Sequence, residues 1–143
     1  MVIRSGTKEL SVFVEGYEFP EIKANEQRFD CDANWLTVNI AFKDEGSSLK
    51  YKDHCISTYE IETTSEEIAD VISGKTSFFI SDYFEPFLKI AFMEAGNDFI
   101  LGVEYVYDSD GWNKHKLAQK LTLDEARQFV DELDSVMMRF PKR

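Results

Sequence analysis

The side chains best suited to metal chemistry in this chain are two cysteines and two histidines: Cys31, His54, Cys55 and His115. Only His54 and Cys55 are neighbours, and in a strand their side chains would point to opposite faces. Zinc ligands usually come in CxxC or HExxH spacing, which the sequence lacks. We therefore expect no metal ion and no cofactor, and we interpret both cysteines as structural thiols.

Carboxylates are the other chemically capable group, because the chain contains 27 aspartate and glutamate residues. Asp82 and Glu85 form one pair that could serve a hydrolase. Glycoside hydrolysis would require the two carboxyls to be held about 5–10 Å apart in a cleft, and the sequence does not fix such a geometry. The turn from Asp108 to Gly111 resembles the start of a calcium loop. It lacks the later acidic ligands, so turn formation explains it better.

The common signatures of enzymes are missing from the sequence. It contains no Gly-x-Ser-x-Gly elbow, no Walker lysine motif and no Gly-x-Gly-x-x-Gly turn. We therefore predict a protein that is not an enzyme, while a hydrolase using loop carboxylates remains an open alternative.

Length, composition and charge restrict the class of protein. With 143 residues, 43% of them hydrophobic, the chain has the size of one compact domain. The net charge of −11 disfavours direct binding to nucleic acid and suits a cationic protein partner, although solubility alone could explain it. We see neither an apolar leader nor a run of about 20 apolar residues, so we expect a cytoplasmic protein without a membrane segment.

One strand organises the predicted fold. Apolar and polar residues alternate strictly over residues 36–43, which indicates a strand with one buried face. A turn over residues 44–48 should lead into a return strand over residues 49–63, with a break near Lys52 and Asp53. Further strands are predicted over residues 10–14, 76–81, 87–94, 99–107 and 112–121.

Two capping boxes predict where helices begin. In each, a threonine is followed three residues later by a glutamate, so that the two side chains can bind each other's free backbone N–H groups. Thr64 with Glu67 predicts a helix of about two turns that ends at Gly74. Thr122 with Glu125 predicts a long amphipathic helix that ends before Pro141. The fold class is α+β: a mainly antiparallel sheet of about six or seven strands, one short helix and a long C-terminal helix packed on the sheet.

A motif around the central strand resembles the opening of the WapI-type immunity proteins. Tyr-Glu-Phe-Pro over residues 17–20 is paired with Asp-Ala-Asn-Trp-Leu over residues 32–36, and Thr-Tyr-Glu over residues 58–60 precedes a helix. The family pattern usually continues with a Trp-containing turn and a Pro-Cys or Pro-Ser step, where this chain has Tyr-Lys-Asp-His-Cys. The motif residues, which we interpret as structural, are Tyr17, Phe19, Pro20, Asn34, Trp35 and Leu36.

That resemblance implies a protein that neutralises the C-terminal toxin domain of a polymorphic, contact-dependent bacterial toxin. Acidic groups mixed with aromatic residues would suit the inhibitor of a basic nuclease, because charge speeds encounter and aromatic side chains provide anchors. A solvated surface is the plainer explanation for any one of these residues. The predicted contact residues are Glu15, Glu18, Glu21, Asp30, Asp32, Glu104, Asp108, Asp110 and Trp112.

A small acidic secretion chaperone or adaptor is the alternative function. Such proteins usually dimerise, so a clean monomer in light scattering would count against this alternative. The sequence leaves the oligomeric state open.

Overall fold

The structure is a computed structural model that describes residues 1–23, 32–106 and 114–143. Eight strands and two α-helices are defined within these residues. In chain order the elements are β1 (Val2–Ser5), β2 (Lys8–Tyr17), the 3-10 turn η1 (Asp32–Asn34), β3 (Trp35–Asp44), β4 (Ser47–Ser57), α1 (Thr58–Ile72), β5 (Phe78–Ile80), β6 (Leu88–Ala95), β7 (Asp98–Val106), β8 (Lys114–Leu121) and α2 (Leu123–Arg139).

The strands form two antiparallel sheets of four strands each, in the orders β1-β2-β3-β4 and β5-β6-β7-β8. The α+β class and the antiparallel pairing are confirmed, with eight strands instead of six or seven. The additional strand is β1, a short edge strand that the sequence analysis missed. The two sheets adjoin at β1 and β8, where the Arg4 backbone N–H donates to Gln119 Oε1 at 2.8 Å.

The predicted central strand is confirmed as β3, which lies between β2 and β4. Its alternating apolar residues are all buried: Leu36, Val38, Ile40 and Phe42. The predicted turn follows it, and Gly46 supplies a φ of +89° there. The predicted break near Lys52 and Asp53 is a register shift inside the continuous strand β4, since Leu36 pairs with Ile56 but Val38 pairs with Asp53.

Helix α1 begins at Thr58, so the prediction of a strand up to residue 63 and of a helix start at Thr64 was wrong. The N-cap is Ser57, whose side chain accepts from the Glu60 backbone N–H, while Glu60 accepts from the Ser57 N–H at 2.7 Å. Thr64 lies inside the helix, and its hydroxyl donates to the Glu60 carbonyl at 2.7 Å. The second capping box, Thr122 with Glu125, is confirmed at the start of α2.

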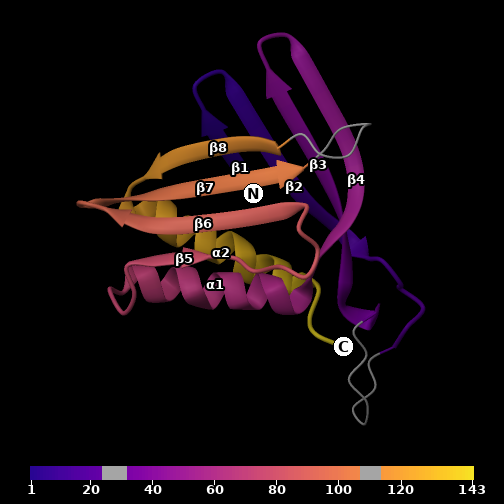
Figure 1. The fold of residues 1–143 in the computed structure, drawn as a ribbon. Coiled ribbons are helices and arrows are strands. Elements are labelled where there is room, and N and C mark those ends of the chain that lie inside the picture. Colours follow the sequence, from indigo (N-terminus) through magenta and orange to yellow (C-terminus); the bar gives the residue numbers. More distant parts are fainter. Residues whose placement is uncertain (24–31, 107–113) are drawn as a thin grey trace.

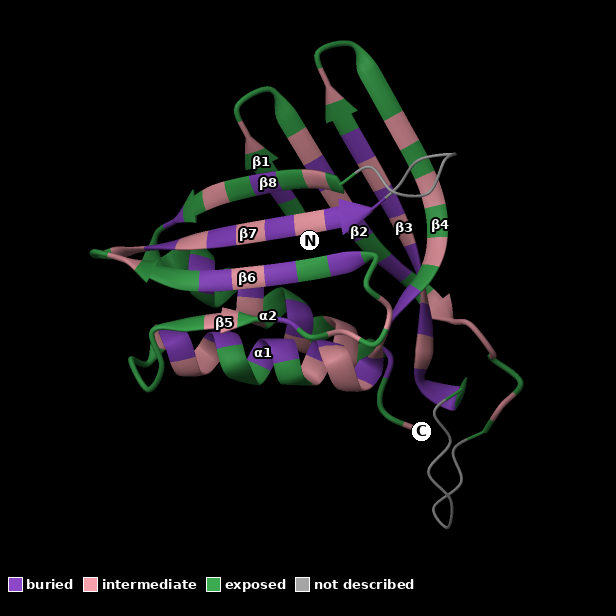
Figure 2. Cartoon of the chain, viewed as in Figure 1, coloured by how far each residue is buried: buried purple, intermediate pink, exposed green. Residues whose placement is uncertain are grey.

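The main core lies between the sheets and the helices. Figure 1 shows both helices on one face of the β5–β8 sheet, while the β1–β4 sheet is steeply rotated against it. Buried residues alternate along β3, β6 and β7 in Figure 2, so each strand turns one side toward this core. Phe42 of one sheet approaches Tyr105 of the other, with ring centroids 5.8 Å apart. None of the helices described is long and apolar enough to cross a membrane.

Candidate functional site

A shallow hollow at the lower end of β3 and β4 collects acidic and aromatic side chains. Its lining comes from the segment after β2, from η1 and the start of β3, from β4, and from the loop of residues 81–87 that leads into β6 (Figure 1). We call this surface the acidic hollow and define it by Glu18, Phe19, Asp32, Trp35, Asp53, His54, Phe84, Glu85 and Phe87. Carboxylates and aromatic rings make up all of this set except His54, and neither lysine nor arginine belongs to it.

Phe84 is the most prominent side chain of the acidic hollow, with 82% of its surface exposed. The loop that carries it is held in place, because the Phe84 backbone N–H donates to Glu60 Oε1 at 2.6 Å. The same carboxylate completes the capping box of α1, so the start of the helix also positions Phe84. The centroid of the Phe84 ring lies 6.1 Å from that of the Trp35 ring, in an edge-to-face arrangement. A large aromatic ring displayed on a fixed loop is typical of a contact residue for a partner.

Three carboxylates of the acidic hollow are only weakly offset by the charges of the described residues. Within the described part of the chain, neither Glu18, Asp53 nor Glu85 has a lysine or arginine within ion-pair distance. Glu18 Oε1 lies 3.9 Å from His54 Nδ1, which also lies 3.2 Å from Thr37 Oγ1. Asp53 accepts a hydrogen bond from the His54 backbone N–H at 2.8 Å. Because these three carboxylates meet no lysine or arginine among the described residues, they present a negative field to an approaching protein.

The structure places other predicted contact residues elsewhere. Glu104 forms ion pairs with Lys114 at 2.9 Å and with Lys116 at 2.8 Å. The hydrogen bond from Lys116 has the largest effect and that from Lys114 the next, and they lower the pKa of Glu104 to about 2. Glu15 binds Lys52 at 2.6 Å, and this hydrogen bond lowers the pKa of Glu15. Neither carboxylate lines the acidic hollow, and each is offset by lysine.

Of the remaining predicted contact residues, Glu18 and Asp32 line the acidic hollow, and Glu21 is exposed outside it. The other predicted contacts lie outside the described residues: Asp30, Asp108, Asp110 and Trp112.

Several residues of the sequence motif hold the end of the chain against the start of β3. Asn34, fully buried, accepts hydrogen bonds from the Thr58 hydroxyl at 2.9 Å and from the Arg143 backbone N–H at 2.9 Å, and it donates to the Arg143 carbonyl at 3.1 Å. The Arg143 guanidinium lies 3.4 Å from the centroid of the Tyr17 ring. The Tyr17 hydroxyl donates to the carbonyl of Pro141.

The other motif residues divide between the core and the acidic hollow. Leu36 is buried in the core and Pro20 is exposed. Phe19 and Trp35 are half-buried and line the acidic hollow. The Phe19 carbonyl also accepts a hydrogen bond from Arg143 Nη1 at 3.4 Å. The motif that holds the chain end therefore also forms one wall of the acidic hollow.

Among the described residues, the possible catalytic and metal-binding groups are not brought together. Asp82 lines a hollow beside α1, whereas Glu85 lines the acidic hollow. The described residues contain no cluster of three metal-ligating side chains. Cys55 is buried. Burial is the main cause, and the nearby Asp53 carboxylate the second, of a rise in the pKa of this thiol to about 12, so the thiol stays protonated. Cys31 lies outside the described residues.

Seven of the nine residues of the hollow were not among the predicted contacts. Phe19 and Trp35 were interpreted as structural, and Glu85 was considered as a catalytic carboxylate. A usable signal was present in Asp-Tyr-Phe-Glu-Pro over residues 82–86, where aromatic and acidic residues share a predicted break between strands. Binding residues lie disproportionately on loops, so an aromatic residue in such a loop is a candidate contact residue. The hollow residues not predicted as contacts are Phe19, Trp35, Asp53, His54, Phe84, Glu85 and Phe87.

Comparison with known proteins gives one match. The family model described as "Immunity protein WapI-like family" matches residues 1–141 of the chain. No curated protein and no solved structure matches it.

Proposed function

The chain belongs to the WapI-like immunity protein family, and we propose that it acts in the cytoplasm, where it neutralises a cognate toxin domain by binding it through the acidic hollow. The family supplies the class of function, an immunity protein directed against a toxin. The observation that supports this contact surface is the exposed Phe84 ring. It belongs to the same hollow as Glu18, Asp53 and Glu85, which have no lysine or arginine within ion-pair distance among the described residues.

The chemistry of the acidic hollow favours a basic toxin surface, such as the substrate groove of a nuclease. A nuclease binds phosphates with lysine and arginine, and a rigid set of carboxylates can replace those phosphates. Phe84 would enter an apolar depression on the toxin, while the surrounding acids meet its cations. Inhibition then follows because the inhibitor occupies the surface and excludes the substrate, without any reaction by the chain itself.

Co-expression tests the proposed function directly. Cells that express the toxin domain encoded next to this protein should stop growing, and co-expression of this chain should restore growth. The two purified proteins should also co-elute as a stable complex. Continued toxicity despite full expression of the folded chain, or separate elution of the two proteins, would contradict an immunity role.

Electrostatic steering gives a quantitative prediction. Reversing two charges of the acidic hollow, with Glu18→Lys and Glu85→Lys together, should lower the association rate constant about 10-fold or more at low salt, because the hollow would no longer attract cations. The variant should also show a weaker decrease of this rate with added salt, since salt screens a smaller attraction. Stopped-flow measurements at several salt concentrations would give both values.

The matched control reverses two exposed charges on α1, with Glu66→Lys and Glu67→Lys. This control changes the net charge equally but leaves the acidic hollow intact, so it should lower the association rate much less. Equal losses in the two double variants would mean that net charge, and not the acidic hollow, controls association.

A further inference from the structure

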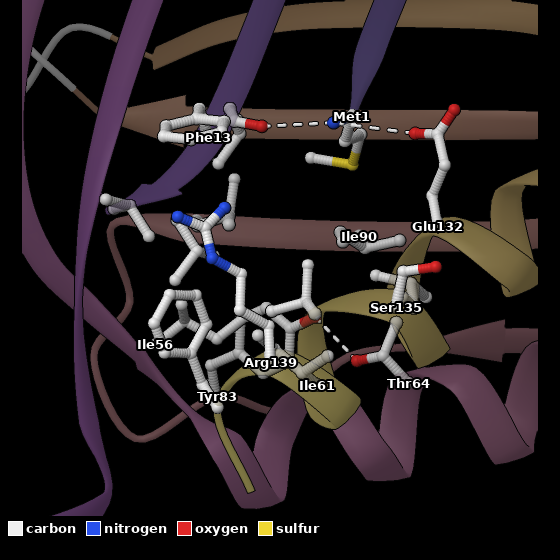
Figure 3. A pocket seen from close by; sticks show the side chains of 17 residues that line it. Met1, Phe13, Ile56, Ile61, Thr64, Tyr83, Ile90, Glu132, Ser135 and Arg139 are labelled. Atoms are coloured by element: carbon white, nitrogen blue, oxygen red, sulfur yellow. Dashed lines mark hydrogen bonds and ion pairs between the residues drawn. The ribbon is translucent and has the colours of Figure 1, made fainter. Parts of the chain in front are cut away.

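A second feature of the molecule is a mostly apolar cavity of about 210 Å³ between the two sheets and α2 (Figure 3). Its lining residues differ entirely from those of the acidic hollow. Buried aliphatic side chains from β3, α1 and β6 form its inner wall, and they include Val38, Ile61, Leu88 and Ile90.

The interior of the cavity offers few polar groups to a ligand. Thr64 and Tyr83 line it, but their hydroxyls bind each other at 2.6 Å, and the Thr64 hydroxyl also donates to the Glu60 carbonyl. A cavity of about 150 Å³ in another protein, lined by aliphatic and aromatic side chains, stays dry and binds benzene. The cavity described here is larger, so a short hydrocarbon chain would fit its size and chemistry.

The mouth of the cavity carries a cation that lacks a carboxylate partner in the described part of the chain. Arg139 extends from α2 toward Phe13 in Figure 3, with its guanidinium carbon 5.8 Å from the Phe13 ring centroid and 5.1 Å from that of Phe140. No carboxylate in the described ranges lies within ion-pair distance of this guanidinium. Glu132, the acidic residue of the lining, lies 3.5 Å from the Met1 amino group, which offsets its charge.

The two aromatic rings hold the guanidinium at the mouth without neutralising it. A guanidinium can donate two parallel hydrogen bonds to one carboxylate, and this geometry is stronger than a contact with a neutral oxygen. A ligand that suits both parts of the site therefore has one carboxylate at the end of an apolar body.

We propose that this cavity binds a small amphipathic monocarboxylate of the medium-chain fatty acid class. The carboxylate binds Arg139 at the mouth, and the hydrocarbon chain lies against the aliphatic wall formed by Val38 and Ile90. This site is independent of the toxin contact, because it uses a different part of the surface and a different class of ligand.

Isothermal titration of the intact protein with octanoate tests the proposal. Octanoate should bind with one molecule per chain and at least about 10-fold more tightly than 1-octanol, which has the same hydrocarbon chain without the charge. Each methylene removed between octanoate and hexanoate should weaken binding about fourfold, because less apolar surface is buried. Failure of octanoate to bind, or equal affinity for octanoate and 1-octanol, would overturn the proposal.

Three variants locate the site. Arg139→Gln should weaken octanoate binding about 10-fold and leave 1-octanol unchanged, whereas Arg127→Gln, at an exposed arginine of the same helix, should change neither. Val136→Phe should remove binding of both ligands by filling the cavity, with circular dichroism as the check of folding. Unchanged octanoate affinity in Arg139→Gln or in a folded Val136→Phe variant would show that octanoate binds elsewhere, and would overturn the proposal.

Discussion

Replacing Phe84 with alanine is expected to weaken binding of the toxin domain about 30- to 700-fold while the free protein stays folded. The ring is 82% exposed in the free chain, so its removal should cost less than about 1 kcal/mol of folding stability, mainly from the lost contact with Trp35. In a complex the same ring would be fully buried, and anchor residues of this kind contribute about 2–4 kcal/mol to binding. The stated loss follows because each 1.4 kcal/mol corresponds to about a factor of 10.

Phe78 provides a matched control for this prediction. It is also an exposed phenylalanine, with 60% of its surface accessible, but it lies on β5 outside the acidic hollow. Phe78→Ala should change the dissociation constant less than about threefold, because a residue outside the interface contributes little to affinity. Surface plasmon resonance with immobilised toxin domain would measure both variants. A larger loss for Phe78 than for Phe84 would move the interface to the outer face of the β5–β8 sheet.

Replacing Asn34 with alanine is expected to lower the free energy of unfolding by about 3 kcal/mol. Among the described residues, the buried amide bonds the Thr58 hydroxyl and the backbone N–H and carbonyl of Arg143. Alanine would leave the Thr58 hydroxyl without this partner in a buried site, and each such unsatisfied group costs about 1–3 kcal/mol. The segment that ends at Arg143 would also lose its attachment to the start of β3.

Asn39 provides a matched control, because its replacement should change the free energy of unfolding only slightly. Its amide donates to Glu15 at a half-buried position of β3, where water can replace the lost hydrogen bond, so Asn39→Ala should cost less than about 1 kcal/mol. Urea unfolding followed by tryptophan fluorescence would give both values. If Asn34→Ala unfolds at the same urea concentration as the native chain, the buried amide does not hold these segments together.

The sequence predicted the sheets better than the first helix, for a physical reason. The alternation in β3 is unambiguous, because a shift of one residue would expose Leu36 and Val38. The first helix contains two possible capping boxes, Ser57 with Glu60 and Thr64 with Glu67, and local chemistry cannot choose between them. Burial of Ile61 against the core favours the earlier start, and that packing is a property of the folded chain.

The same limit applies to the candidate site. Glu18, Asp32 and Trp35 could be selected from the sequence because they lie within the motif segments. Phe84 and Glu85 come from a loop about 50 residues later in the chain, and the hydrogen bond from the Phe84 backbone N–H to Glu60 brings that loop to the hollow. Counting charges along the sequence gives Glu104 and Glu18 the same weight as contact residues. In the fold, Lys116 lies directly opposite Glu104 on the neighbouring strand and offsets its charge.

Hydrogen–deuterium exchange of the chain with and without its toxin domain would show directly whether the toxin covers the acidic hollow, because backbone amides in the contact exchange more slowly in the complex. If the toxin binds there, exchange should slow in the segment after β2, in residues 32–36 and in the loop of residues 81–87, while the exposed strand β5 stays unchanged. Protection confined to other surfaces, with residues 81–87 exchanging at the same rate in the complex as in the free chain, would contradict binding at the acidic hollow.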